Sequence, residues 1–179
     1  IQSAPFGPVG ALDGIPPFES LKETLMTIAT TTHLNFRGTA RQALEFYRGV
    51  FGGDVTLATY GDVGMPADVP GADRIVFGQV ENADGFRLMA YDIPGASDDD
   101  AATAGTTWRE NGATLTDRAF FQSVRADSLD ELTGYWDALA DGGSIVEPLA
   151  ASAWSPGFGM LTDRFGVTWV LDVRAAYAG

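Results

Sequence analysis

The sequence predicts an α+β protein in which two similar βαβββ halves form curved mixed sheets around a small-molecule cleft. One order of features occurs twice: an alternating strand, an amphipathic helix, a Gly-Gly pair and a later strand that ends in Asp and an apolar residue. The apolar face of the second predicted helix follows that of the first by 89 positions, and the terminal strands repeat at a spacing of 80. Repetition of a whole unit in the same order indicates a duplication.

Composition narrows the class of protein. The chain has 179 residues, of which 45% are hydrophobic and 11% aromatic, enough to bury a core. Its net charge of −13 argues against binding to nucleic-acid phosphates, which requires a basic face. The absence of cysteine excludes disulfides and thiolate metal sites, and a single histidine, His33, excludes any site that needs two imidazoles from one chain. Because no apolar run approaches the ~20 residues of a membrane span, we expect a cytoplasmic protein without a membrane partner.

The first residues differ in composition from the rest. Residues 1–26 hold four of the nine prolines and the only lysine, which favours an extended or turn-rich leader. Met26 fits a natural start, with the leader added or taken from a longer gene model; the alternative is an arm that packs on a partner subunit. The remaining chain divides into a first module, a connector and a second module, at 27–97, 98–118 and 119–179.

The first half begins with a half-buried strand and an amphipathic helix. Thr32–Arg37 alternates, with Leu34 and Phe36 on one face. From Ala40 to Phe51, apolar residues recur at the i, i+3, i+4 and i+7 spacing of one helical face. Thr39 is the expected N-cap and Gly52-Gly53 the end of this helix. Three strands should follow, at Val55–Thr59, Arg74–Glu81 and Phe86–Ile93, with a mobile loop at Gly61–Gly71 between the first two.

The second half repeats this pattern after an acidic connector. The composition of Pro94–Gly105, which includes Asp98-Asp99-Asp100, predicts a solvent-exposed connector. A strand is predicted at Ala119–Ala126, then a helix from about Ser128 that ends at Gly142-Gly143. Its expected apolar face is Leu129, Leu132, Trp136, Leu139 and Ala140. A terminal strand at Thr168–Val173 matches Leu88–Ile93.

The segment from His33 to Gly53, HLNFRGTARQALEFYRGVFGG, resembles the opening of the vicinal oxygen chelate superfamily. This superfamily includes glyoxalase I, the bleomycin resistance proteins, fosfomycin-modifying enzymes and extradiol dioxygenases. More narrowly, the chain is similar to the PhnB-like branch, through Tyr60-Gly-Asp62 with its following Met-Pro loop and through Trp154–Trp169. The likeness spans about Thr30 to Val173.

The resemblance implies paired βαβββ modules, often completed as a homodimer, and in the enzymes a divalent metal held by one His or Glu from each of four strands. Such a metal acts as a Lewis acid on a substrate oxygen. In this sequence His33 is displaced by about one strand repeat from the family's ligand histidine, and Asp92 and Asp172 lie towards the strand ends. The other ligand positions hold non-ligating residues: Phe121 or Gln122, Met89 or Ala90, and Val170. We therefore expect no cofactor, with one divalent metal ion as the alternative.

His33 is the candidate catalytic residue, as a general base or acid or as one ligand of a weak metal site, because an imidazole is the side chain suited to proton exchange near neutral pH. The alternative is a hydrogen-bonded strand residue in the cleft wall or in a dimer interface. Aromatics of the Ala151–Leu161 loop either cover a ligand or plug the end of the sheet, and strand parity alone does not say which strand aromatics face the cleft. The expected cleft residues are Asn35, Arg37, Tyr60, Met89, Tyr91, Phe121, Trp154, Phe158 and Trp169.

Two functional hypotheses follow. In the first, the protein is a metal-free module that binds an apolar or amphipathic small molecule, as the bleomycin resistance proteins do. In the second, it is a glyoxalase-type enzyme (a lyase, isomerase, transferase or dioxygenase) that uses a reduced metal site or His33 as acid or base. The missing ligands and the abundant aromatics favour the first.

Overall fold

The computed structural model describes residues 30–96 and 106–174. The predicted leader at 1–26 and the acidic triplet at 98–100 lie outside the described residues. Within the described part, no helix is long and apolar enough to cross a membrane.

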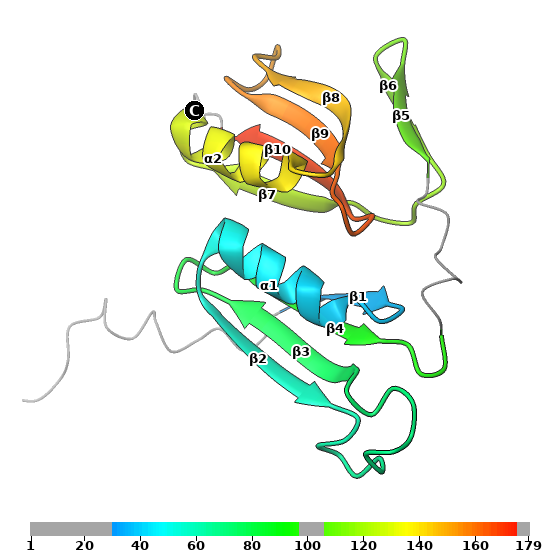
Figure 1. The fold of residues 1–179 in the computed structure, drawn as a ribbon. Coiled ribbons are helices and arrows are strands. Elements are labelled where there is room, and N and C mark those ends of the chain that lie inside the picture. The colour runs from blue at the N-terminus through cyan, green and yellow to red at the C-terminus, as the bar shows by residue number, and fades with distance from the viewer. Residues whose placement is uncertain (1–29, 97–105, 175–179) are drawn as a thin grey trace, which may run out of the picture. The chain divides into compact units, whose positions relative to one another are not determined.

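The first module is a four-stranded mixed sheet with one helix on one face (Figure 1). Its strands lie in the order β1-β4-β3-β2, with β1 parallel to β4 and the other pairs antiparallel. The predicted strands and helix of this half are confirmed to within one residue at each end. Their bounds are β1 Thr32–Phe36, α1 Ala40–Phe51, β2 Asp54–Thr59, β3 Ile75–Glu81 and β4 Arg87–Asp92.

The second module repeats the same topology in the order β7-β10-β9-β8, with β7 parallel to β10. This agreement confirms the duplicated βαβββ unit. The first strand begins at Gln122 rather than at the predicted Ala119, and Phe158 and Met160, expected in a loop, belong to a strand. The elements are β7 Gln122–Ala126, α2 Leu129–Ala140, β8 Ser144–Ala150, β9 Phe158–Thr162 and β10 Thr168–Val173.

A hairpin that the sequence analysis did not predict precedes the second module. Its strands are β5 (Thr107–Glu110) and β6 (Ala113–Thr116), joined by Asn111-Gly112. Both turn residues have positive φ, 51° and 79°, the conformation that makes Asn-Gly the preferred pair in tight hairpins. One side of the hairpin packs towards β8, where Arg109 Nε donates to Glu147 Oε2 at 2.8 Å.

The buried face of α1 and the carboxylate of Asp92 hold the first module together. Leu44 packs so closely on β3 that a Cβ on Gly78 would lie 2.3 Å from its Cδ1, so only glycine fits there. Thr39 occupies the N-cap position but makes no side-chain capping bond. Asp92 Oδ1 instead accepts the N–H groups of Gly38 and Ala40 at 2.8 and 3.0 Å, and its Oδ2 accepts that of Ile75 at 2.9 Å. One buried carboxylate therefore ties the ends of β4, α1 and β3.

The helix α2 differs from its prediction at its first residue. Ser128 caps it, accepting the Glu131 N–H at 3.2 Å. Leu132 and Leu139 are buried as predicted, whereas Leu129 is 45% exposed. Leu129 lies in the first turn, before the helix packs fully on its sheet.

The two modules meet on the sides that carry their helices. Tyr47 Oη of α1 donates to Asp163 Oδ2, in the β9–β10 turn, at 2.8 Å. Trp169 Nε1 donates to the same oxygen at 2.8 Å, and the N–H groups of Phe165 and Val167 donate to Oδ1. The Tyr47 and Trp169 rings lie 5.5 Å apart, as do those of Phe51 and Trp169. The joint is thus an aromatic core built around one satisfied carboxylate.

We predict that Tyr47→Phe lowers the free energy of unfolding by about 1–3 kcal/mol at pH 7, because it removes one donor to a buried carboxylate. Burial, followed by the charge of Asp163 and the hydrogen bond to it, raises the pKa of Tyr47. Above pH ~10 the unfolded tyrosine ionises while the folded one stays protonated, so this residue's stabilising contribution is present at lower pH and lost as pH rises.

Urea unfolding at pH 7 and pH 10.5 measures both effects. The wild type should lose more stability between these pH values than Tyr47→Phe does. Tyr91→Phe, on an exposed sheet face, is the control. Equal losses in wild type and Tyr47→Phe would contradict the role given to this joint.

Candidate functional site

Each sheet has a second face, opposite its helix, which we call the outer face. In the first sheet, the residues that point to α1 alternate with the outer-face residues, since side chains alternate along a strand. Strand register aligns His33 with Met89 and Met89 with Gln79, and places Asn35 beside Tyr91. The outer face of this sheet thus includes His33, Asn35, Phe77, Gln79, Met89 and Tyr91, and at one end the ion pair of Glu81 with Arg87.

This face is open in the described part of the chain. His33 and Asn35 are exposed, and Phe77 is 38% exposed. The His33 and Tyr91 rings meet edge to face with centroids 5.4 Å apart. The structure thus brings together four of the predicted residues: His33, Asn35, Met89 and Tyr91. Arg37 follows the end of β1 and is half-buried.

Tyr60 lies just beyond β2, near the end of β4. Its hydroxyl donates to the Asp92 carbonyl oxygen at 2.8 Å. Burial, together with the neighbouring Tyr91 and Asp92, raises the pKa of its phenol. Tyr60 therefore stands at the margin of the outer face and keeps its proton at neutral pH.

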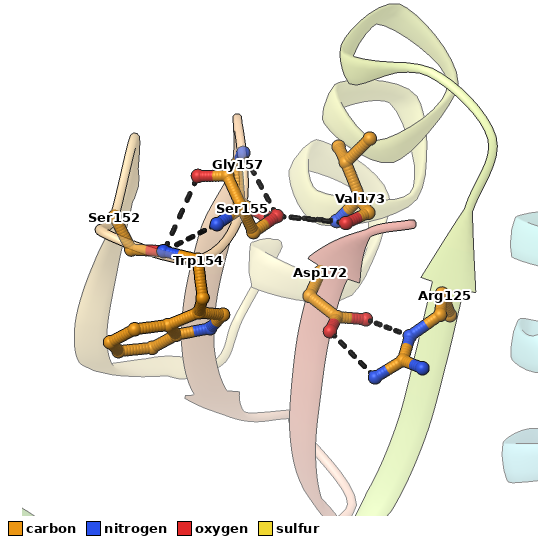
Figure 2. A network of polar contacts seen from close by, with 7 residues as sticks. All are labelled: Arg125, Ser152, Trp154, Ser155, Gly157, Asp172 and Val173. Carbon is orange, nitrogen blue, oxygen red and sulfur yellow. Dashed lines mark hydrogen bonds and ion pairs between the residues drawn. The ribbon is translucent and has the colours of Figure 1, made fainter. Parts of the chain in front are cut away.

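The outer face of the second sheet carries an ion pair and apolar side chains. Arg125 Nε and Nη2 each donate to one carboxylate oxygen of Asp172 at 2.9 Å (Figure 2). Val170 lies between Ser123 and Met160 in the register, and Asp172 pairs with Phe158. The β5–β6 hairpin covers part of this face: Arg109 Nε donates to Glu147 Oε2 at 2.8 Å, and Met160, whose Sδ lies 3.7 Å from Thr114 Oγ1, is 2% exposed.

A buried serine fixes the loop that carries Trp154. Ser155 is 5% exposed, and its Oγ accepts the Val173 N–H at 3.1 Å and lies 2.7 Å from the Gly157 carbonyl oxygen. Figure 2 shows this hydroxyl between the loop and the end of β10. Trp154 itself is 58% exposed, and its ring meets that of Phe158 at 5.2 Å. The aromatic pair is thus presented to solvent from an anchored loop.

One predicted cleft residue, Trp169, lies elsewhere. Trp169 is fully buried on the helix side of β10, where its indole N–H binds Asp163, so it is a core residue and not part of the outer face. Phe121 precedes β7 and is partly buried. Nearly every position of β10 is apolar, so the sequence offered no alternation that could place Trp169.

The side chains on the paired strands do not fit a four-ligand metal centre. In the first sheet His33 is paired with Met89, and in the second Ser123 is paired with Val170. A thioether is a soft ligand, a neutral serine hydroxyl is a weak one, and valine has no donor atom, whereas such a centre needs carboxylates or imidazoles. Nowhere among residues 30–96 and 106–174 do three His, Asp or Glu side chains gather closely enough to hold an ion.

Comparisons with known proteins agree with this architecture. The family model of the Glyoxalase/Bleomycin resistance protein/Dioxygenase superfamily matches residues 31–171. The crystal structure of protein PA1353 from Pseudomonas aeruginosa is 30% identical, with a TM-score of 0.65 over 83% of this chain and 98% of that one. A PhnB protein from Bacillus cereus is 23% identical, with a TM-score of 0.59 over 82% and 100% of the two chains. No curated protein matches.

We predict that Ser155→Ala frees the Trp154 loop. Loss of the hydroxyl removes a buried partner of the Gly157 N–H and of the Val173 carbonyl oxygen, although the Val173 N–H still donates to the Gly157 oxygen at 2.9 Å. This loss should lower stability by about 1–3 kcal/mol. Urea unfolding and the accessibility of tryptophan to acrylamide measure the two effects, with exposed Ser144→Ala as the control. Unchanged stability and unchanged quenching would show that Ser155 does not anchor the loop.

Proposed function

Because the chain belongs to the glyoxalase/bleomycin resistance protein/dioxygenase superfamily, we propose that it binds an apolar or amphipathic small molecule on its outer faces without a four-ligand metal centre. The observation that carries this proposal is the chemistry of those faces. They present aromatic, thioether and amide groups and one histidine, and their carboxylates are paired with arginines: Glu81 with Arg87, Glu147 with Arg109 and Asp172 with Arg125. Such a lining, mostly apolar with a few polar groups, is typical of small-molecule sites.

A second copy of the chain would complete the site. Within one chain, the modules meet through Tyr47, Asp163 and Trp169 on the helix side. The outer faces therefore do not cover one another, and Phe77 and Trp154 stay exposed. A large exposed apolar patch is typical of an interaction surface. We propose a homodimer in which an outer face of each copy encloses the ligand, in a cytoplasmic protein.

His33 supports an alternative function. Its imidazole is exposed on the outer face beside Tyr91, where it could exchange a proton with a bound molecule. In that case the protein is a glyoxalase-type enzyme (lyase, isomerase, transferase or dioxygenase) with His33 as acid or base, or with a reduced metal site.

The binding proposal predicts that the neutral apolar dye N-phenyl-1-naphthylamine binds and gains fluorescence. Tyr91→Arg should weaken binding at least tenfold, because it places a charge in the middle of the outer face. Val63→Asp, at an exposed valine away from the sheets, should not. Light scattering should show a dimer in the wild type, and a shift of Tyr91→Arg towards monomer. Equal affinity in the two variants, or a wild-type monomer at micromolar concentration, would count against the proposal.

Metal binding separates the two functions. After equilibration with Mn²⁺, Zn²⁺ or Fe²⁺ and dialysis, the binding proposal expects less than one equivalent of metal, because hard ligands do not converge on these faces. Retention of one equivalent that is lost in His33→Ala would favour the enzyme. Asn35→Ala, a neighbour on the same face, controls for general disturbance of the sheet.

A further inference from the structure

A separate pocket of about 250 Å³ lies at the end of the first sheet. It is formed where the β2–β3 loop meets the turn after β4. The loop, predicted as mobile, is tied by backbone bonds from Gly61 N to the Ala72 oxygen at 2.7 Å and from Met65 N to the Tyr60 oxygen at 3.0 Å. The lining includes Tyr60, Met65, Pro70, Arg74, Pro94 and Ala96. The pocket thus has defined walls made by the first module alone.

Arg74 is the charged group of this pocket. It is half-buried, and its Nη1 donates to the Ala96 carbonyl oxygen. No carboxylate lies within ion-pairing distance of it in the described part of the chain, although acidic residues outnumber basic ones 24 to 11. Other arginines there have such a partner: Arg87, Arg109, Arg118, Arg125, Arg164 and Arg174.

Two carboxylates of the adjoining segments, Asp62 and Asp92, are occupied by other donors. Asp62 Oδ2 accepts the N–H and the hydroxyl of Thr59, both at 2.8 Å. Asp92 uses both its oxygens for the backbone N–H groups of the helix start and of β3. The local fold therefore directs these negative groups to other partners and leaves further guanidinium N–H groups of Arg74 available to a ligand.

The chemistry of the lining indicates the ligand. A guanidinium presents paired N–H donors that match a carboxylate, and partial burial strengthens the attraction. Tyr60, Met65 and the two prolines supply apolar surface, and a thioether packs well against an aromatic ring. The volume lies below the usual ~300–1,000 Å³ of ligand pockets, which restricts the ligand to a small molecule.

We propose that this pocket binds a small aromatic monocarboxylate, with its carboxylate on Arg74 and its ring between Tyr60, Met65 and the prolines. The site adjoins the margin of the first outer face at Tyr60, but it needs neither a second copy nor the function proposed for the outer faces. Recognition rests on charge, so the neutral amide of the same ring should bind much more weakly.

Titration of the ¹⁵N-labelled protein with benzoate and with benzamide, followed by NMR, tests this site. Benzoate should bind at least tenfold more tightly than benzamide and should shift the amide signals of Tyr60, Arg74 and Ala96. Arg74→Gln should weaken benzoate binding at least tenfold. Arg74→Lys should weaken it less, because lysine keeps the positive charge but lacks the paired N–H donors of the guanidinium. Arg87→Gln, which removes a surface arginine on β4, should bind benzoate as the wild type does.

Met65→Trp provides an independent variant, since it retains Arg74 but fills the pocket; it should also lose benzoate. Circular dichroism establishes that each variant is folded, and Met65→Trp and Arg74→Lys decide the outcome if Arg74→Gln does not fold. Equal affinity for benzoate and benzamide, undiminished binding to the folded variants, or shifts confined to the outer faces would overturn the proposal. None of these results depends on whether the naphthylamine dye binds the outer faces.

Discussion

The carboxylate of Asp163 is the constraint on which the arrangement of the two modules depends. A buried charge is costly unless it is paired or fully hydrogen-bonded. Asp163 is 4% exposed and receives four donors, two from its own turn and two from Tyr47 and Trp169. Because Tyr47 comes from the first module, the charge is satisfied only when the modules meet on the helix side. That contact in turn leaves the outer face of the first sheet open, and the outer face of the second sheet covered in part by the β5–β6 hairpin.

A second buried carboxylate, Asp92 at the end of β4, acts differently. Asp92 binds only backbone N–H groups, all of them within the first module. It therefore fixes the ends of strands and a helix relative to one another, independently of the second module. Asp163 uses side-chain donors as well, and through one of them it reaches across the joint. The fold thus separates stability within a module from attachment between modules.

The sequence predicts those parts of the fold that local periodicity encodes. Leu34 and Phe36 mark the buried side of β1, and the spacing from Ala40 to Phe51 marks that of α1. The pair Asn111-Gly112 is also typical of a tight hairpin. The sequence analysis treated 98–118 as a connector and so did not predict this hairpin. The start of α1 is capped by Asp92 and not by the predicted Thr39. Asp92 is more than 50 positions away from Gly38 and Ala40 in the sequence, and no local pattern reveals such a contact. For the same reason the sequence did not indicate that Arg74 lines a pocket.

Arginine pairing distinguishes the two surfaces that could hold a ligand. On the outer face of the second sheet, Arg125 and Asp172 satisfy each other with two parallel bonds, so a ligand there must displace an existing partner to use either charge. Arg74 has only a neutral carbonyl partner in the described part of the chain, so an anion can bind it without breaking an ion pair. The outer faces should therefore select by shape and apolar area, and the Arg74 pocket by charge. A chain with a net charge of −13 repels anions from most of its surface, so selection by charge requires a sheltered guanidinium of this kind.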